Sequence, residues 1–228
     1  MTLIRAISSM ATREVLRDLA AMYGKLSNLR LELESVGGVD AAKRVQAGEA
    51  FDVVFLASDA IDKLQAARKV VDGSRVDIVK SGVSVAVKSG SPKPDISSED
   101  ALKRAVLDAP TIGYSTGPSG TALLKLMERW GIAGQVRARL VQAQPGVPVG
   151  SLVAQGKVAL GFQQLSELIH QEGIDIVGPM PQGAQITTIF SGAVCEACRE
   201  QEAARALLDF MASPAAADAK HRQGMEPA

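Results

Sequence analysis

The sequence is poor in aromatic residues, at 4% of its 228 positions, and it has no excess of charge of either sign. Lys and Arg together number 25, as do Asp and Glu, so the formal net charge at pH 7 is zero. A nucleic-acid-binding protein needs a basic surface, and single-strand binders stack bases on aromatic side chains. The composition therefore argues against a nucleic-acid partner.

Long apolar runs are also missing. No stretch of about 18 consecutive apolar residues occurs, which argues against a membrane-spanning helix. A secretory signal would combine a basic start, an apolar stretch and a small-residue cleavage site. Residues 1–7 have instead the pattern of a first strand. The sequence as written thus predicts a cytoplasmic protein, and a periplasmic protein with a trimmed start is the alternative.

Metal-binding and redox-active residues are scarce. The two cysteines are Cys195 and Cys198, and the two histidines, His170 and His221, lie far from one another and from the cysteines. A zinc site would need two more ligands at suitable spacing. A thioredoxin-like pair opens a helix early in a βαβ unit, whereas this pair follows a late predicted strand. We interpret the cysteines as incidental thiols and expect no metal and no cofactor.

Common catalytic motifs are also missing from the sequence. The sequence has no Gly-x-Ser-x-Gly elbow, no P-loop ending and no Gly-x-Gly-x-x-Gly fingerprint. With two histidines, a Ser-His-Asp arrangement is disfavoured. Asp40 and Asp59 lie in strand-to-helix turns, where a helix cap is the simpler interpretation than a general base. No catalytic residue is identified.

Strands and helices alternate along the chain, which predicts an α/β fold with mostly parallel sheets flanked by helices. The predicted strands are 3–7, 29–36, 53–56, 76–79, 82–87, 111–114, 140–143, 159–163, 174–177 and 186–194. The predicted helices are 12–23, 39–47, one capped by Ser58 or Asp59, 97–107, 122–130, 149–155, 166–171, 200–211 and 214–222. Two crossings, near 80–82 and 179–183, divide the chain into a first lobe (1–80 and 183–228) and a second lobe (81–182).

Four strand-to-helix turns carry residues suited to an anion: 8–9, 37–40, 57–59 and 117–121. Backbone N–H groups at a helix start have no intrahelical partner and carry the positive end of the helix dipole. Helix capping alone also favours Ser, Thr, Asp and Gly, and for any single turn it is the simpler interpretation. The turn Gly117-Pro118-Ser119-Gly120-Thr121 contains more than a helix cap requires, because two glycines flank its serine. Ser9 lies where an N-cap belongs.

A buried strand also ends in two glutamines, Gln163 and Gln164. Their amides could donate to and accept from a ligand, or they could simply mark where the strand reaches solvent. The complete candidate ligand-binding set is Ser8, Ser9, Gly37, Gly38, Ser58, Ser115, Gly117, Ser119, Gly120, Thr121, Gln163 and Gln164.

The order of these motifs resembles the type II periplasmic solute-binding proteins, in particular the molybdate-binding branch. The resemblance covers the whole chain, and it is strongest in Ala6-Ile7-Ser8-Ser9-Met10, in the segment 46–58 and in Val158-Ala159-Leu160-Gly161-Phe162. It implies two α/β lobes that clamp a small anion between helix N-termini, and it supports Ser8, Ser9, Ser58 and the Ser119 turn as contacts. It also implies a monomer that works with an ABC-importer permease if the protein is exported.

Two departures separate the chain from molybdate binders. Gly37-Gly38 stands where that branch usually offers serine hydroxyls, and Gln164 stands where a tyrosine usually closes over the oxyanion. We therefore expect a larger anion such as an organic carboxylate. Bacterial aconitate isomerases also resemble this branch, so a carboxylate isomerase that transfers a proton in the same cleft is the alternative to simple binding.

Overall fold

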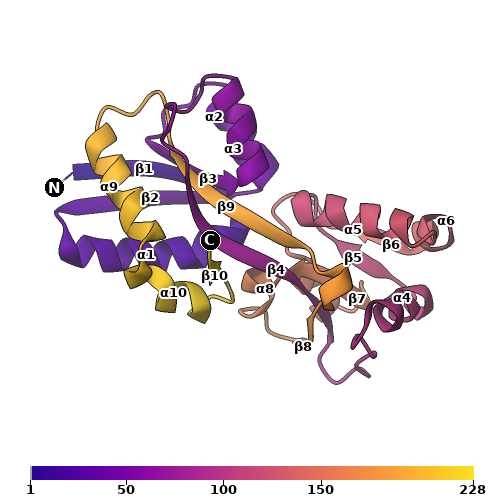
Figure 1. Cartoon of the computed structure of the whole chain (residues 1–228). Helices are drawn as coiled ribbons and strands as arrows, with labels where there is room; N and C mark the ends of the chain where they lie inside the picture. Colours follow the sequence, from indigo (N-terminus) through magenta and orange to yellow (C-terminus); the bar gives the residue numbers. More distant parts are fainter. Residues whose placement is uncertain (1) are drawn as a thin grey trace. The chain divides into compact units, whose positions relative to one another are not determined.

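The computed structural model describes residues 2–228 and divides the chain into two compact units (Figure 1). Unit 1 contains the chain up to Ser81 together with Thr188–Ala228, and unit 2 is Gly82–Thr187. The chain passes from one unit to the other within strands β4 (Val76–Lys88) and β9 (Thr187–Val194). Within residues 2–228, no helix has the length and apolar character needed to cross a membrane.

The second crossing lies later in the chain than the sequence predicts, because the segment 179–184 is bound to unit 2. Strand β8 (Ile174–Pro179) pairs antiparallel with β4, and the N–H of Met180 donates to the carbonyl of Val83 at 3.2 Å. Met180 and Ala184 then pack into the apolar core of unit 2. The turn at 179–183 is therefore internal to unit 2.

The sheet of unit 1 has the strand order β2-β1-β3-β9. Strands β1 (Thr2–Ser9), β2 (Leu29–Val36) and β3 (Val53–Ala57) are parallel, and β9 runs antiparallel to β3. The short β10 (Glu226–Pro227) pairs with β4. The helices of the unit are α1 (Arg13–Leu26), α2 (Gly38–Gln46), α3 (Ser58–Ala66), α9 (Gln201–Ala212) and α10 (Ala217–Arg222), with 3-10 turns at Met10–Thr12 and Pro214–Ala216.

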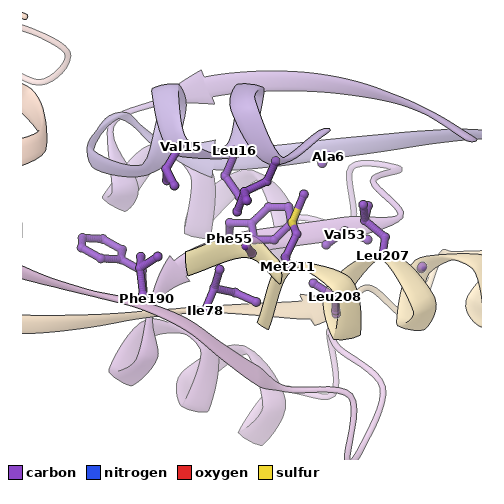
Figure 2. Packing of buried hydrophobic residues seen from close by; sticks show 14 of the residues in the cluster. Ala6, Val15, Leu16, Val53, Phe55, Ile78, Phe190, Leu207, Leu208 and Met211 are labelled. Atoms are coloured by element: carbon purple, nitrogen blue, oxygen red, sulfur yellow. The ribbon is translucent and has the colours of Figure 1, made fainter. Parts of the chain in front are cut away.

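Both faces of this sheet are covered by helices. On one face, Phe55 packs with side chains of α1 and α9, such as Leu16 and Leu207 (Figure 2). On the other face, Val54 packs with side chains of α2 and α3, such as Val45 and Ile61. Neighbouring residues of β3 point to opposite faces, so a strand buried on both sides needs an unbroken apolar run. This requirement explains the sequence Val53-Val54-Phe55-Leu56.

Unit 2 has the strand order β4-β7-β5-β6, with β8 also paired to β4. Strand β5 (Ile112–Tyr114) is parallel to both β7 (Leu160–Gln164) and β6 (Leu140–Gln142), and β4 is antiparallel to β7. The helices are α4 (Glu99–Asp108), α5 (Pro118–Arg129), α6 (Ala133–Val136), α7 (Val149–Ala154) and α8 (Leu165–Leu168), with 3-10 turns at Arg137–Arg139 and Gln182–Ala184.

The predicted α/β class, with two lobes and two crossings, is confirmed. The two extended runs predicted at 76–79 and 82–87 form the single strand β4. The elements α6 and β10 and the 3-10 turns were not predicted from the sequence. These elements are only two to four residues long, too short to establish a periodic pattern.

Candidate functional site

In unit 1, three of the four predicted ligand turns meet at one edge of the sheet. The strands β2, β1 and β3 are parallel neighbours, with Ser9 paired to Val36 and Ser8 paired to Phe55. Their carboxyl ends therefore lie together, and the next residues along the chain are Gly37-Gly38 and Ser58. In open α/β sheets this edge is where ligands bind. We call the group Ser8, Ser9, Gly37, Gly38 and Ser58 the unit 1 half-site.

Hydroxyl groups are in direct contact in the unit 1 half-site. The Oγ atoms of Ser8 and Ser35 lie 2.8 Å apart, and Ser9 Oγ lies 3.4 Å from Thr12 Oγ1. Ser8 is fully buried and Ser9 is 7% exposed. A Cβ atom added to Gly38 would lie 3.4 Å from Ser9 Cβ, so the glycine turn packs directly on the serine. The sequence did not single out Ser35 or Thr12; the spacing of Thr12 three residues after Ser9 was the available signal.

Helix capping does not account for these serines. Helix α1 has Thr12 as its N-cap, after a 3-10 turn, and Ser9 caps that turn without a side-chain bond. Helix α3 has Ala57 as its N-cap, and Ser58 is its first residue. The predictions that Ser9 caps the first helix and that Ser58 or Asp59 caps the third are therefore wrong, because a 3-10 turn separates β1 from α1 and because β3 continues to the start of α3. Ser98, by contrast, accepts from the N–H of Ala101 at 3.1 Å as a true cap.

The second group of candidate residues lies in unit 2, after strand β5 and at the end of strand β7. These strands are parallel neighbours, with Ile112 paired to Leu160, so their carboxyl ends also share an edge. The members of this unit 2 half-site are Ser115, Gly117, Ser119, Gly120, Thr121, Gln163 and Gln164. The Oγ atoms of Ser115 and Ser119 lie 3.1 Å apart. Ser119 is 7% exposed, whereas Thr121 lies on the exposed surface of α5.

Gly120 is required by the backbone of this turn. A Cβ atom at this position would lie 1.9 Å from the carbonyl oxygen of Ser115, which no side chain can occupy. Gly117 is different, because a Cβ there would lie 3.7 Å from Ser115 Oγ, an ordinary contact. Of the two glycines that flank Ser119, only the second is fixed by packing.

The two glutamines are buried at 2% and 3% exposure, so the interpretation that they mark an exit into solvent is wrong. The Oε1 atom of Gln163 accepts from the N–H of Gly150, near the start of α7, at 3.0 Å. This bond fixes the amide orientation, because only the carboxamide oxygen can accept from an N–H. The amino group of Gln163 is therefore the end that faces away from Gly150. Gln164 ends β7 and is the N-cap residue of α8.

Neither half-site contains an ionisable side chain. The donors of the unit 1 half-site are hydroxyl groups and the backbone N–H groups at the starts of α2 and α3. The donors of the unit 2 half-site are hydroxyl groups, the oriented amide of Gln163 and the backbone N–H groups at the start of α5. Such donors can hold an anion without adding a formal positive charge. Across residues 2–228, no cluster of three or more His, Cys, Asp or Glu residues is suited to a metal ion. Each half-site is confined to one unit, and the clamping of one ligand by both stays a prediction.

The fold and its two donor clusters define the class of solute-binding proteins. The family model for bacterial extracellular solute-binding proteins matches residues 4–226, so the chain belongs to that family. The chain is also 38% identical over 234 residues to an aconitate isomerase from Pseudomonas sp., an alignment that covers 99% of this chain and 88% of the relative.

Solved structures show the same fold at low sequence identity. The periplasmic molybdate-binding protein of Azotobacter vinelandii aligns with a TM-score of 0.80 at 20% identity, over 97% of this chain and 98% of that one. The sulfate-binding protein SubI of Mycobacterium tuberculosis aligns with a TM-score of 0.77 at 18% identity, over 100% and 87% of the two chains. A periplasmic thiamin-binding protein aligns with a TM-score of 0.78 at 17% identity, over 99% and 83%. The predicted type II solute-binding fold is confirmed.

Proposed function

We propose that this protein binds a small organic anion with more than one carboxylate group. The observation that carries the proposal is that each unit presents buried hydroxyls at helix starts that those hydroxyls do not cap. Ser9 and Ser119 illustrate this arrangement, one in each unit. A hydrogen bond to a charged ligand contributes about 1.5–3 kcal/mol, so a few such donors account for useful affinity.

Two features favour a carboxylate over a tetrahedral oxyanion. The turn Gly37-Gly38 at the start of α2 offers backbone N–H groups and no side-chain hydroxyl, whereas a hydroxyl-rich turn would suit a compact oxyanion. In unit 2, the Gln163 amide is a neutral donor of fixed orientation, which can donate to one carboxylate oxygen of a larger ligand. The 38% identity with an aconitate isomerase, a protein named for a tricarboxylate, supports the same ligand class.

Isomerisation is the second candidate function, and the identity to aconitate isomerase over almost the whole chain favours it. Such a reaction removes a proton from one allylic carbon and returns a proton to another, so no electrons are gained or lost. It requires a general base near the substrate carbon and donors for the carboxylates. The half-sites supply the donors, and the base is unassigned because no candidate residue is ionisable.

If the protein acts as an exported binder, its partner would be the permease of an ABC importer. Membership of the extracellular solute-binding family supports this proposal. Fractionation of the source cells tests the compartment: a periplasmic or extracellular pool supports the transport role. A purely cytoplasmic pool supports an enzyme or a sensor.

Calorimetric titration with molybdate, sulfate, citrate, cis-aconitate and trans-aconitate tests the binding proposal. We expect heat of binding and a higher melting temperature with the tricarboxylates, because ligand that binds only the folded state stabilises it. Ser9→Ala and Ser119→Ala should each weaken binding roughly 10- to 100-fold, from the loss of one hydrogen bond to a charged ligand. Ser213→Ala is the matched control. Binding of no carboxylate would refute the proposal.

The isomerase candidate needs a separate assay. Incubation with cis-aconitate in heavy water, followed by proton NMR, detects both the trans isomer and deuterium exchange at the allylic carbon. Formation of the trans isomer establishes the enzyme. Tight binding without isomerisation or exchange would leave the protein as a binder only.

A further inference from the structure

The two cysteines are a feature that the proposed function does not use. Cys195 and Cys198 stand at the two ends of a turn after β9, where the N–H of Cys198 donates to the carbonyl of Cys195 at 3.0 Å. Residues that close a turn in this way have Cα atoms within about 7 Å of each other. Disulfides span Cα distances of about 4.4–6.8 Å. The backbone therefore already holds the two residues at a separation suited to a disulfide.

This turn is anchored on both sides. The N–H of Cys195 donates to the carbonyl of Asp52 at 2.9 Å, and Cys195 forms an antiparallel bridge with Val70. The N–H of Glu196 donates to the carbonyl of Lys69 at 3.1 Å. The sequence contains no third cysteine, so each of these thiols has the other as its one intramolecular partner.

Both thiols lie in surroundings that disfavour the thiolate. Burial raises the pKa of the Cys195 thiol to about 12, with the negative charges of Cys198 and Asp52 acting in the same direction. Burial likewise raises the pKa of the Cys198 thiol to about 11, and Asp52 adds to this. A catalytic Cys-x-x-Cys pair has a lowered thiol pKa, which stabilises the reduced form. Here the reduced form has no such stabilisation.

We propose that Cys195 and Cys198 form a structural disulfide by exchange with a small-molecule disulfide such as oxidised glutathione. In the first step, one cysteine thiolate attacks oxidised glutathione, which forms a mixed disulfide and releases one reduced glutathione. The second thiolate then attacks the protein sulfur of the mixed disulfide and releases the second glutathione. The protein loses two thiol protons and two electrons, and one oxidised glutathione takes them up to become two reduced molecules.

Both cysteines of the turn are buried in unit 1. Cys195 packs in the cluster that contains Val54 and Val70, and Cys198 packs in the cluster that contains Leu207. The position is remote from the unit 1 half-site, because β9 is antiparallel to β3. Val194, next to Cys195, pairs with the first residue of β3, whereas Ser58 follows its last residue. The disulfide is therefore a stabilising modification that leaves ligand binding unchanged.

Intact-mass measurement of the full chain tests this. The protein is refolded from denaturant in a buffer of oxidised and reduced glutathione, so that burial does not block the reaction, and is then alkylated in denaturant. We expect a mass about 2 Da lower than that of the reduced chain, with no alkylation. We expect no bound glutathione, because the second thiol displaces glutathione from the mixed disulfide. Reduction with dithiothreitol should restore two alkylatable thiols and lower the melting temperature.

Cys198→Ser is the matched variant. Because it has no second thiol, it should end the same treatment with Cys195 either alkylated or carrying one glutathione, and never with the loss of about 2 Da. Two alkylatable thiols on the refolded wild-type chain would overturn the proposal. A wild-type chain that keeps a glutathione adduct, or that forms a disulfide-linked dimer, would overturn it too. These outcomes do not depend on which solute the protein binds.

Discussion

The two half-sites are built from different donors, and the difference indicates a division of labour. In unit 1 the side-chain donors are hydroxyls in mutual contact, such as Ser8 with Ser35, and each can rotate and can donate or accept. Unit 2 also has a rotatable hydroxyl pair, Ser115 with Ser119, but it adds the amide of Gln163, which the N–H of Gly150 holds in one orientation. The donors of unit 1 can adapt to a ligand, whereas unit 2 adds one donor of fixed orientation. We expect ligand selectivity to reside in unit 2.

The glycines of the two half-sites also differ in how much their surroundings can yield. Among the changes considered, Gly120→Ala in unit 2 should cost the most stability. Its Cβ would meet the Ser115 carbonyl at 1.9 Å, and backbone cannot yield as a side chain can. We expect a loss of about 3 kcal/mol of unfolding free energy, as for severe overpacking. Urea denaturation measures it. Gly117→Ala, with ordinary contacts, is the control in the same turn.

Gly38→Ala tests the adaptable side of the same comparison. Its Cβ would meet the Ser9 side chain at 3.4 Å, so a small shift relieves the contact and the loss should stay below about 1 kcal/mol. Equal losses for Gly38→Ala and Gly120→Ala would show that the two turns are equally rigid.

Gln163→Glu tests the imposed geometry in unit 2. The new side chain keeps an oxygen for the Gly150 N–H but loses the amino donors and brings a negative charge to the ligand. Like charges repel, and a lost bond to a charged group is worth about 1.5–3 kcal/mol, so affinity for tricarboxylates should fall at least about 100-fold. Isothermal titration measures this. Gln163→Leu removes the donors without the charge and should weaken binding less.

Two lysines, one in each unit, differ in whether their ammonium group has a hydrogen-bond partner. In unit 2, the Nζ atom of Lys103 donates to the carbonyl of Trp130 at 2.8 Å. In unit 1, Lys220 is fully buried and its Nζ has no hydrogen-bond partner among the described residues. Burial lowers the pKa of Lys220 below its ordinary value. Lys220→Met should therefore raise the unfolding free energy at neutral pH by about 1–3 kcal/mol, because it removes a buried polar group without a partner.

The pH dependence of that gain has a definite sign. The unfolded chain binds the Lys220 proton below a pH of about 10.5, whereas the folded chain binds it only below its lowered pKa. Between these two values the wild-type stability rises with pH, and above about pH 10.5 the penalty is gone. The stabilisation by Lys220→Met should thus shrink from pH 7 to pH 10 in urea titrations. A constant difference would show that Lys220 is charged in the folded core.

The smallest expected effects separate capping from binding. Ser98→Ala removes a true N-cap and should cost about 1 kcal/mol of stability without changing affinity. Ser9→Ala should cost less than about 1 kcal/mol of stability while it weakens ligand binding, because its hydroxyl makes no cap bond and lies a long 3.4 Å from Thr12 Oγ1. Thermal denaturation and titration of both variants measure the two quantities. A large stability loss in Ser9→Ala would mean that this hydroxyl is structural.

Much of the fold could be predicted from the sequence, because alternation and turn residues are local signals. The run Val53–Leu56 and the Gly37-Gly38 break are examples. The misassigned caps at Ser9 and Ser58 depended on where strands end, which is set by pairing with distant strands. The orientation of Gln163 depended on a bond from Gly150, and no local pattern reports such a contact.

The crossings within β4 and β9 make unit 2 an insertion in the sequence of unit 1. During synthesis, all of unit 2 emerges before β9, the strand that pairs with β3 and completes the unit 1 sheet. Until β9 has been synthesised, the edge of β3 in unit 1 therefore has no pairing strand. Contacts between residues far apart in the sequence form slowly, so we expect unit 2 to fold before unit 1. In the nascent chain, unit 1 should therefore be the part most prone to aggregation.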